Sequence, residues 1–167
     1  MAHPGAALRW WTAMGPLVFL RDVLPDDFPI FFDHQRDPDA TKMAAFPPRE
    51  RAAFMGHWTH KVLGDPEVKK KTIVFSGSVA GHVVSFSQGG ERLVGYWIGR
   101  DHWGKGVATA ALREFLKYET SRPLRARVAD GHVASCRVLE KCGFSRIGAG
   151  RGTANGAEVD ELVYVLR

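Results

Sequence analysis

The sequence predicts a mixed α+β fold in which helices flank a mostly antiparallel sheet. The chain has 167 residues and is 45% hydrophobic, which is enough for one core and too little for two independent domains. Residues 72–98 contain β-branched and aromatic runs separated by short turns, which predicts three consecutive antiparallel strands. Residues 107–119 and 133–142 carry apolar side chains at helical spacing on either side of a predicted strand at 124–128.

The N-terminal end is expected to differ from the rest of the chain. Pro, Gly and Arg interrupt the apolar residues of the first sixteen positions, so we expect residues 1–16 to form a flexible tail. Residues 17–167 are expected to form a single domain. The short apolar run at 17–20 follows Gly-Pro and predicts the first buried strand.

Two helices are expected after this strand. Proline and acidic residues from Pro25 are typical of a helix start, and residues 49–63 have a helical apolar repeat that ends at Gly64. The Asp37-Pro38 pair is interpreted as a break between them. The lysine run 69–71 is expected to be a solvated turn.

The C-terminal part is expected to contain one further helix and two strands. The helix over 133–142 should end at Gly143, where a left-handed cap lets Phe144 pack back on Leu139. Strands are predicted near 144–147 and 161–166, with the glycine-rich residues 148–156 as a loop between them. The sheet therefore has six to seven strands, flanked by about four helices.

Composition limits the classes of partner. The formal charge of +5 suits nucleic acid, acidic lipid or a small polyanion, but no basic aromatic motif indicates a specific nucleic-acid site. No apolar run approaches the ~20 residues that cross a bilayer, so no membrane contact is expected. Cys136 and Cys142 lie six positions apart on one predicted helix and point in different directions, so a disulfide is not expected and a cytoplasmic location is favoured.

The segment with the clearest chemical signal lies between a strand and a helix, at residues 97–109. Gly104 and Gly106 allow close approach to the main chain, and the free N–H groups and dipole of the helix start attract an anion. Ala108 and Thr109 are small enough to admit a phosphate. We therefore predict a phosphate-binding loop.

Three other interpretations of this loop are possible. The glycines suit a tight turn with only a geometric role. A Walker loop is disfavoured because its glycine and lysine spacing is missing. A dinucleotide fold is disfavoured because Thr109 takes the third glycine position, and too little chain follows for a doubly wound sheet.

These residues resemble the GNAT superfamily of N-acetyltransferases, in particular its RimJ/RimL-type branch. The cofactor signature of that family, Gln or Arg, two residues, Gly, one residue, then Gly or Ala, falls on Trp103, Gly106 and Ala108. Residues 130–144 resemble the branch's segment in which Asn-x-Ala-Ser leads into a helix closed by Gly-Phe, with His132 in place of the asparagine. The resemblance implies a GNAT-like central sheet over most of the chain.

The resemblance also implies a reaction. Acetyl-CoA is expected to donate its acetyl group by direct attack of a primary amine, either a protein N-terminus or a small molecule, in a ternary complex without a metal. The strand before the loop is expected to splay from its neighbour and bind pantetheine. The residues expected to bind the cofactor are Trp97, Ile98, Trp103, Gly104, Lys105, Gly106, Val107, Ala108, Thr109, His132 and Ser135.

The catalytic groups are less clearly indicated. The family tyrosine that protonates the leaving thiolate aligns with Leu139, which leaves Ser135 as the candidate general acid. A structural hydroxyl in the first helical turn is an equally good interpretation of Ser135. The base is not identified. The nominees are His34, His102, Glu91 and Asp101, each of which is more simply explained as a surface or turn residue. His57 and His60 are interpreted as helix-face residues rather than metal ligands, and Cys136 as a buried thiol rather than an acyl carrier.

The acceptor side is expected to lie on the early helices. Residues 33–38 and 43–46 resemble the family segment that walls the acceptor, which nominates His34, Gln35, Met43 and Phe46. A monomer or a homodimer is expected. The alternative function is a catalytically weak acyl-CoA sensor or partner-binding domain with the same fold, because the tyrosine and the asparagine are both replaced.

Overall fold

A seven-stranded sheet forms the centre of the molecule. The computed structural model describes residues 17–167, so the tail expected at 1–16 lies outside the described residues. The strand order is β1-β2-β3-β4-β5-β7-β6, and only β4 and β5 pair in parallel. The strands are β1 (Val18–Arg21), β2 (Lys69–Phe75), β3 (Ser78–Gln88), β4 (Glu91–Ile98), β5 (Leu124–Ala129), β6 (Ser145–Ala154) and β7 (Ala157–Leu166).

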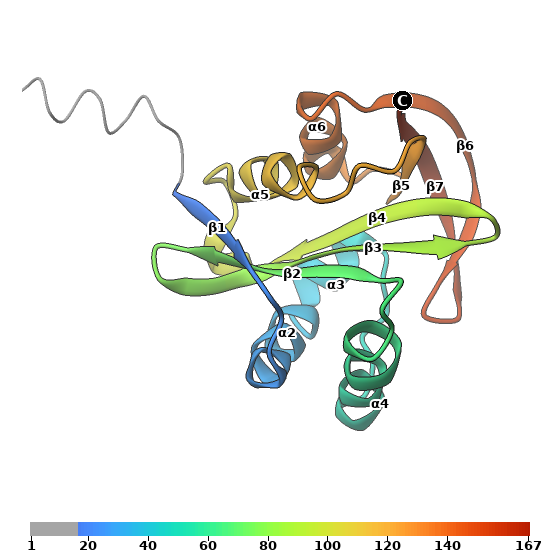
Figure 1. The fold of residues 1–167 in the computed structure, drawn as a ribbon. Coiled ribbons are helices and arrows are strands. Elements are labelled where there is room, and N and C mark those ends of the chain that lie inside the picture. The colour runs from blue at the N-terminus through green and yellow to red at the C-terminus, as the bar shows by residue number, and fades with distance from the viewer. Residues whose placement is uncertain (1–16) are drawn as a thin grey trace, which may run out of the picture.

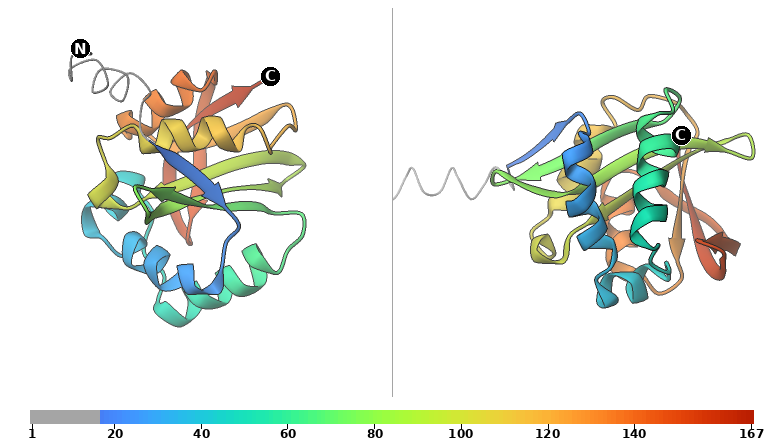
Figure 2. Two further views of the ribbon diagram at one scale, coloured as in Figure 1. Left: turned by 60° about the vertical axis from the view of Figure 1, so that its left-hand side comes forward. Right: turned by 90° about the horizontal axis from the view of Figure 1, so that it is seen from below.

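Helices cover both faces of the sheet (Figures 1 and 2). On one face lie α5 (Val107–Phe115) and α6 (Val133–Lys141), and on the other lie α2 (Phe28–Gln35), α3 (Pro38–Ala44) and α4 (Arg51–Gly56), which continues as a π-helical segment (His57–Leu63). Short 3₁₀ turns occupy Pro25–Asp27 and Arg100–His102. The predicted α+β fold with a mostly antiparallel sheet is therefore confirmed. No helix within residues 17–167 is long and apolar enough to span a membrane.

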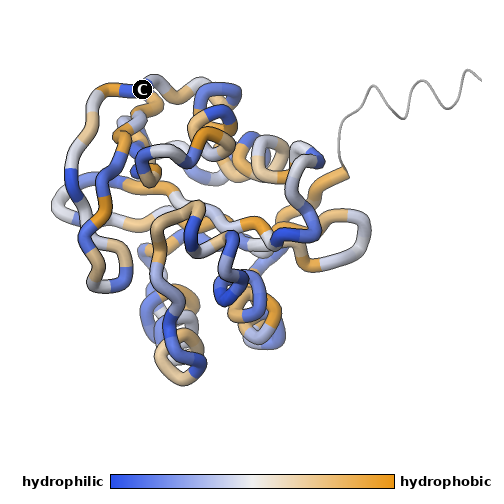
Figure 3. Tube along the Cα trace, turned by 180° about the vertical axis from the view of Figure 1, so that it is seen from behind, coloured by the Kyte–Doolittle hydropathy of each residue, from blue (hydrophilic) through white to orange (hydrophobic). Residues whose placement is uncertain are grey.

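Each face of the sheet has its own hydrophobic core. Under α5 and α6 the buried side chains include Leu112, Phe115 and Leu139, while under α2 and α4 aromatic side chains such as Phe31 and Trp58 dominate. Hydrophobic and hydrophilic residues alternate along the strands and helices in Figure 3, as expected for elements that bury one side.

The helix α6 ends where its sequence indicates. Gly143 has φ +92°, and the N–H of Phe144 donates to the carbonyl of Leu139 at 3.0 Å. Both Leu139 and Phe144 are buried in the same core. The predicted left-handed stop is thus confirmed.

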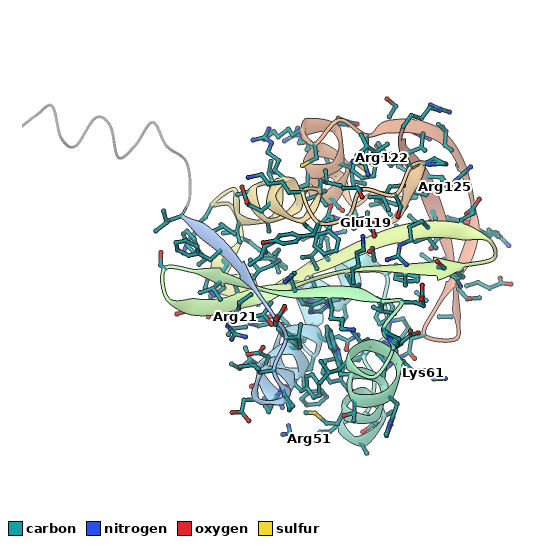
Figure 4. All side chains as sticks on the ribbon, in the orientation of Figure 1. Arg21, Arg51, Lys61, Glu119, Arg122 and Arg125 are labelled. Atoms are coloured by element: carbon teal, nitrogen blue, oxygen red, sulfur yellow. The ribbon has the colours of Figure 1, made fainter. Side chains whose placement is uncertain are left out.

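A buried carboxylate connects the end of α5 to the sheet. Glu119 accepts hydrogen bonds from the Ser85 hydroxyl, the Arg92 Nε (3.0 Å) and the Ser121 N–H (2.9 Å). Burial alone would raise its pKa, but these hydrogen bonds outweigh burial and lower the pKa of Glu119 to about 2. Figure 4 shows Glu119 between α5 and the sheet, so this charge joins two layers of the fold.

The Asp37-Pro38 pair does interrupt the helical chain after α2, and it also starts a further helix, α3, that was not expected. The Asp37 carboxylate accepts from the N–H groups of Asp39 (2.9 Å) and Ala40 (3.2 Å), and Pro38 occupies the first helical position. An aspartate followed by proline is a helix start as well as a break, because both residues suit the first turn.

The lysine run is not a turn: Lys69, Lys70 and Lys71 begin β2 and pair with Ser85, Val84 and Val83 of β3. Each ammonium group finds an oxygen, including the carbonyl of Asp65 for Lys70 and the carboxylate of Asp22 for Lys71. Pairing with β3 therefore overrides the weak strand propensity of lysine.

The loop expected at 148–156 is also wrong, because β6 and β7 form a long hairpin that turns only at Asn155 and Gly156. A Cβ atom at Gly152 would lie 2.3 Å from the Glu161 carboxylate. Glycine at this position permits the close approach of neighbouring strands. A strand that is rich in glycine for this reason resembles a loop in its sequence.

Candidate active site

The parallel pairing of β4 and β5 stops early. Only Arg92 with Leu124 and Leu93 with Arg125 are paired, although β4 continues to Ile98 and β5 to Ala129. Beyond these pairs the two strands diverge. The facing edge of β4 therefore offers main-chain N–H and C=O groups to a ligand.

The glycine loop lies where β4 leads into α5. Gly104 and Gly106 have φ values of +70° and +73°, in the region that favours glycine. The first hydrogen bond of α5 runs from the N–H of Ala110 to the carbonyl of Gly106 at 3.1 Å. The N–H groups of Val107, Ala108 and Thr109 consequently have no partner within the helix and form an anion-binding end.

Two side chains of this loop point back onto it. The indole N–H of Trp103 donates to the carbonyl of Ile98 at 2.9 Å, which ties the loop to the end of β4. The Lys105 ammonium donates to the carbonyl of Asp101 at 3.0 Å. Trp103 lines the adjoining cavity, whereas Lys105 does not.

A cavity of about 1400 Å³ runs from this loop through the gap between β4 and β5 to the face covered by α4. That volume exceeds the usual range for one small ligand and suits a large cofactor together with a second molecule. Of the residues expected to bind the cofactor, those lining it are Trp97, Ile98, Trp103, Gly104, Gly106, Val107, Ala108, Thr109, His132 and Ser135.

The Ser135 hydroxyl is paired with a side chain that sequence reasoning missed. Its Oγ lies 2.8 Å from the hydroxyl of Tyr96, and that hydroxyl also donates to the carbonyl of Ser135 at 3.3 Å. Burial raises the pKa of Tyr96, only partly offset by the Ser135 hydrogen bond. The alternation of β4 was the available signal, since it places Tyr96 on the face of the sheet that α5 and α6 cover.

His132 caps α6. Its Nδ1 accepts from the N–H of Ser135 at 3.4 Å, and desolvation lowers the pKa of this imidazole. A neutral ring that accepts at Nδ1 carries its proton on Nε2. His132 therefore holds the helix end and keeps one N–H donor for the cavity.

The nominated bases are scattered. His102 lines the cavity, but His34, Glu91 and Asp101 do not. Glu91 is engaged by Arg125 and Arg127 at 3.4 and 3.3 Å. Desolvation, with a contribution from His102, lowers the pKa of His34, whose ring packs against Gly99.

A different carboxylate lines the cavity. Glu161 of β7 faces the side of the sheet covered by α4 and lies 3.8 Å from Arg127. Burial raises the pKa of Glu161, and Arg127 offsets part of that rise. A carboxylate held in this way accepts a proton more readily than an exposed one. The sequence predicts this strand only from residue 161 onward. Glu161 is then its first residue, and the preceding alternation that places its side chain on the cavity face is not recognised.

The early helices contribute to the second end of the cavity. The residues that line it are Gln35, Met43 and Phe46. The Phe46 ring packs edge to face on Trp97, with 6.0 Å between the ring centroids. The Trp97 indole N–H donates to the carbonyl of His34 at 3.3 Å, so His34 holds Trp97 through its main chain. His57 lines the cavity too, whereas His60 is exposed.

Comparison with known proteins agrees with this geometry. The acetyltransferase (GNAT) domain family matches residues 18–145. The uncharacterized N-acetyltransferase p20 of Bacillus licheniformis is 22% identical over 161 residues, covering 88% of this chain and 90% of that protein. A GNAT-family acetyltransferase structure from Bacillus anthracis has a TM-score of 0.73 at 19% identity, covering 89% and 93% of the two chains.

A second solved structure is the spermidine N-acetyltransferase of Vibrio cholerae in complex with CoA and spermine. It has a TM-score of 0.75 at 17% identity and covers 89% of this chain and 94% of its own. Likeness at this level concerns the fold, while the family match covers most of the chain. The chain therefore belongs to the GNAT family and is an acetyltransferase.

Proposed function

We propose that this protein transfers the acetyl group of acetyl-CoA to a primary amine, as a member of the RimJ/RimL-type branch, with residues 17–167 acting as one domain. The observation that carries the proposal is the gap between β4 and β5, which opens directly onto the glycine loop at the start of α5. A cofactor with an extended amide arm and a pyrophosphate matches an exposed strand edge joined to an anion-binding helix end.

The cofactor is assigned along this path. Its pyrophosphate binds the free N–H groups from Gly104 to Thr109, with Lys105 as a nearby cation. Its pantetheine arm pairs with the edge of β4, and the Nε2–H of His132 is a further donor. A main-chain N–H near Trp97 polarises the thioester carbonyl as charge develops on its oxygen. Trp103 supports the loop rather than the phosphate.

The transfer proceeds by direct attack in a ternary complex. The amine nitrogen bonds to the thioester carbon while Glu161 accepts a proton from it, directly or through water. The tetrahedral intermediate then expels the CoA thiolate as its C–S bond breaks. Ser135 gives its hydroxyl proton to that sulfur and regains a proton from Tyr96, which is restored from solvent.

The acceptor binds at the opposite end of the cavity from the phosphates. Its wall includes Gln35, Met43 and Phe46, which lie on or beside α2 and α3. The acceptor thus approaches from the α4 side of the sheet, while the cofactor arm occupies the gap between the strands.

Release of free CoA from acetyl-CoA tests this function. Thiol release should depend on an added amine, when a library of peptide N-termini, polyamines and small amines is screened. Acetyl-CoA that binds without any amine-dependent release would instead support the acyl-CoA sensor. That alternative is favoured by Leu139, which stands in the position of the family tyrosine and is fully buried in the core.

A further inference from the structure

The charged groups on the sheet side of the acceptor region are already paired. Glu91 bonds to Arg125 and Arg127 at 3.4 and 3.3 Å, and Glu161 lies 3.8 Å from Arg127. These groups compensate one another across β4, β5 and β7. The sheet therefore presents little net charge to an acceptor.

Arg49, which comes just before α4, is different. Its guanidinium packs over the Phe46 ring at 5.4 Å and lines the cavity. Desolvation lowers the pKa of Arg49, yet no carboxylate lies within ion-pair distance of it in residues 17–167. A half-buried guanidinium keeps a planar fork of N–H donors that matches a carboxylate.

Arg49 also lies close to the reacting end of the cavity. Arg49 packs on Phe46, and the centroid of the Phe46 ring lies 6.0 Å from that of Trp97 on the β4 edge. The Asn155 amide of the β6–β7 turn donates to the carbonyl of Pro47 at 2.9 Å. The segment that carries Arg49 is thus held between the thioester position and the hairpin.

The π-helical segment that continues α4 also lines the cavity. His57 lines the cavity, with Lys61 four residues further along. Asp65 and Glu67 line the cavity beyond the end of this π-helical segment. Arg49 thus lies at the start of this wall, and Lys61 lies beside the carboxylates Asp65 and Glu67 at its other end.

Resting on the proposed acetyl transfer, we propose that the acceptor is a small amine that carries a carboxylate, as amino acids do, and that Arg49 binds this carboxylate. The pairing fixes the amine beside the β4 edge. At the position of the carboxylate, an ammonium group of a polyamine would instead meet the Arg49 guanidinium as a like charge. The site therefore favours an amino acid over a polycation such as spermine.

The test compares matched amines. Three amino acids are assayed for CoA release: phenylalanine, leucine and β-alanine. Each is compared with its amide and with the amine formed by its decarboxylation, and spermine serves as the polycation. We expect kcat/KM for at least one acid to exceed that for its amide by about tenfold or more, since a lost charged hydrogen bond has about this effect.

Two arginine variants provide the contrast. Arg49→Gln should reduce the acid-to-amide discrimination about tenfold, with the loss appearing in KM, and Arg49→Lys should restore part of it. Arg51→Gln is the matched control, because Arg51 packs over Phe32 at 5.2 Å in the same way but does not line the cavity. Figure 4 shows Arg51 on α4 and Lys61 at a separate position on the π-helical segment that follows it.

Failure of this inference is distinguishable from failure of the acetyl transfer. Turnover with amides or spermine and not with acids would overturn the carboxylate acceptor and leave the transferase. If no amine gives turnover, calorimetric titration of the acids into CoA-loaded protein tests whether they bind. Arg49-dependent binding without turnover would support the acid site and overturn the transfer, and neither binding nor turnover with any acid would overturn the acid site.

Discussion

The two ends of the cavity are built from different materials. The cofactor end consists of main chain: an unpaired edge of β4, two glycines in left-handed conformations, and the free N–H groups of α5. The acceptor end consists of side chains, including Phe46, Arg49 and Glu161. Main-chain sites depend on glycine spacing and element order, which a sequence displays. Side-chain sites depend on which elements meet in the fold, and a sequence does not display these contacts.

The first prediction breaks the cofactor end. Gly106→Glu puts a carboxylate among the N–H groups expected to bind the pyrophosphate. Repulsion between two charges about 4 Å apart near a surface is about 4 kcal/mol, so acetyl-CoA affinity should fall about a thousandfold. Equilibrium titration measures it. The control is Gly77→Glu in the β2–β3 turn, since Gly77 has a similar φ of +78° and does not line the cavity. Equal affinity in the two variants would refute the phosphate assignment.

The second prediction removes the proposed base at the acceptor end. Glu161→Gln should lower kcat about a hundredfold, the lower range for general base catalysis, with little effect on acetyl-CoA binding. Burial raises the pKa of Glu161. The active carboxylate is therefore lost as pH falls through a value above the ordinary 4.5, and the acidic limb of the kcat/KM profile should disappear in the variant. An unchanged limb would assign it to another group.

The third prediction concerns the proposed acid, at the junction of the two ends. Ser135→Ala should lower turnover about tenfold while acetyl-CoA affinity is kept, because water in the open cavity replaces part of the hydroxyl's function. Single-turnover kinetics separate the two quantities. Cys136→Ala is the control, since its thiol does not line the cavity. Wild-type turnover of Ser135→Ala would return the hydroxyl to a structural role.

The fourth prediction is the smallest and concerns Tyr96. Tyr96→Phe removes the hydroxyl that lies 2.8 Å from the Ser135 Oγ, and turnover should fall a few-fold. If the two hydroxyls act as one unit, the double variant with Ser135→Ala should be no slower than Ser135→Ala alone. Additive losses would mean that Tyr96 acts separately from Ser135. A double-mutant cycle on kcat measures the coupling.

The contrast also explains what could be predicted from the sequence. The glycines before α5 and those of residues 148–152 look alike in sequence, yet the first form a loop and the second a strand. The first lead directly into an amphipathic helix, which identifies them. The second are fixed by pairing with β7, a contact that no local pattern reveals.

The site residues that were not predicted also depend on contacts between distant parts of the chain. Tyr96 and Ser135 are 39 positions apart, and their pairing depends on how α6 lies over β4. Glu161 reaches the cavity because Gly152 leaves space beside it. His132 was expected to bind the cofactor, and the fold also uses its Nδ1 as the acceptor that caps α6.

Thermal unfolding with acetyl-CoA tests the central claim most directly. At a hundredfold its Kd, a ligand that binds only the folded state stabilises it by ~2.7 kcal/mol. We expect acetyl-CoA to raise the Tm clearly. NAD, which has a pyrophosphate but no pantetheine arm for the β4 edge, should raise it far less. No shift with acetyl-CoA, or an equal shift with NAD, would contradict a cofactor site between β4 and β5.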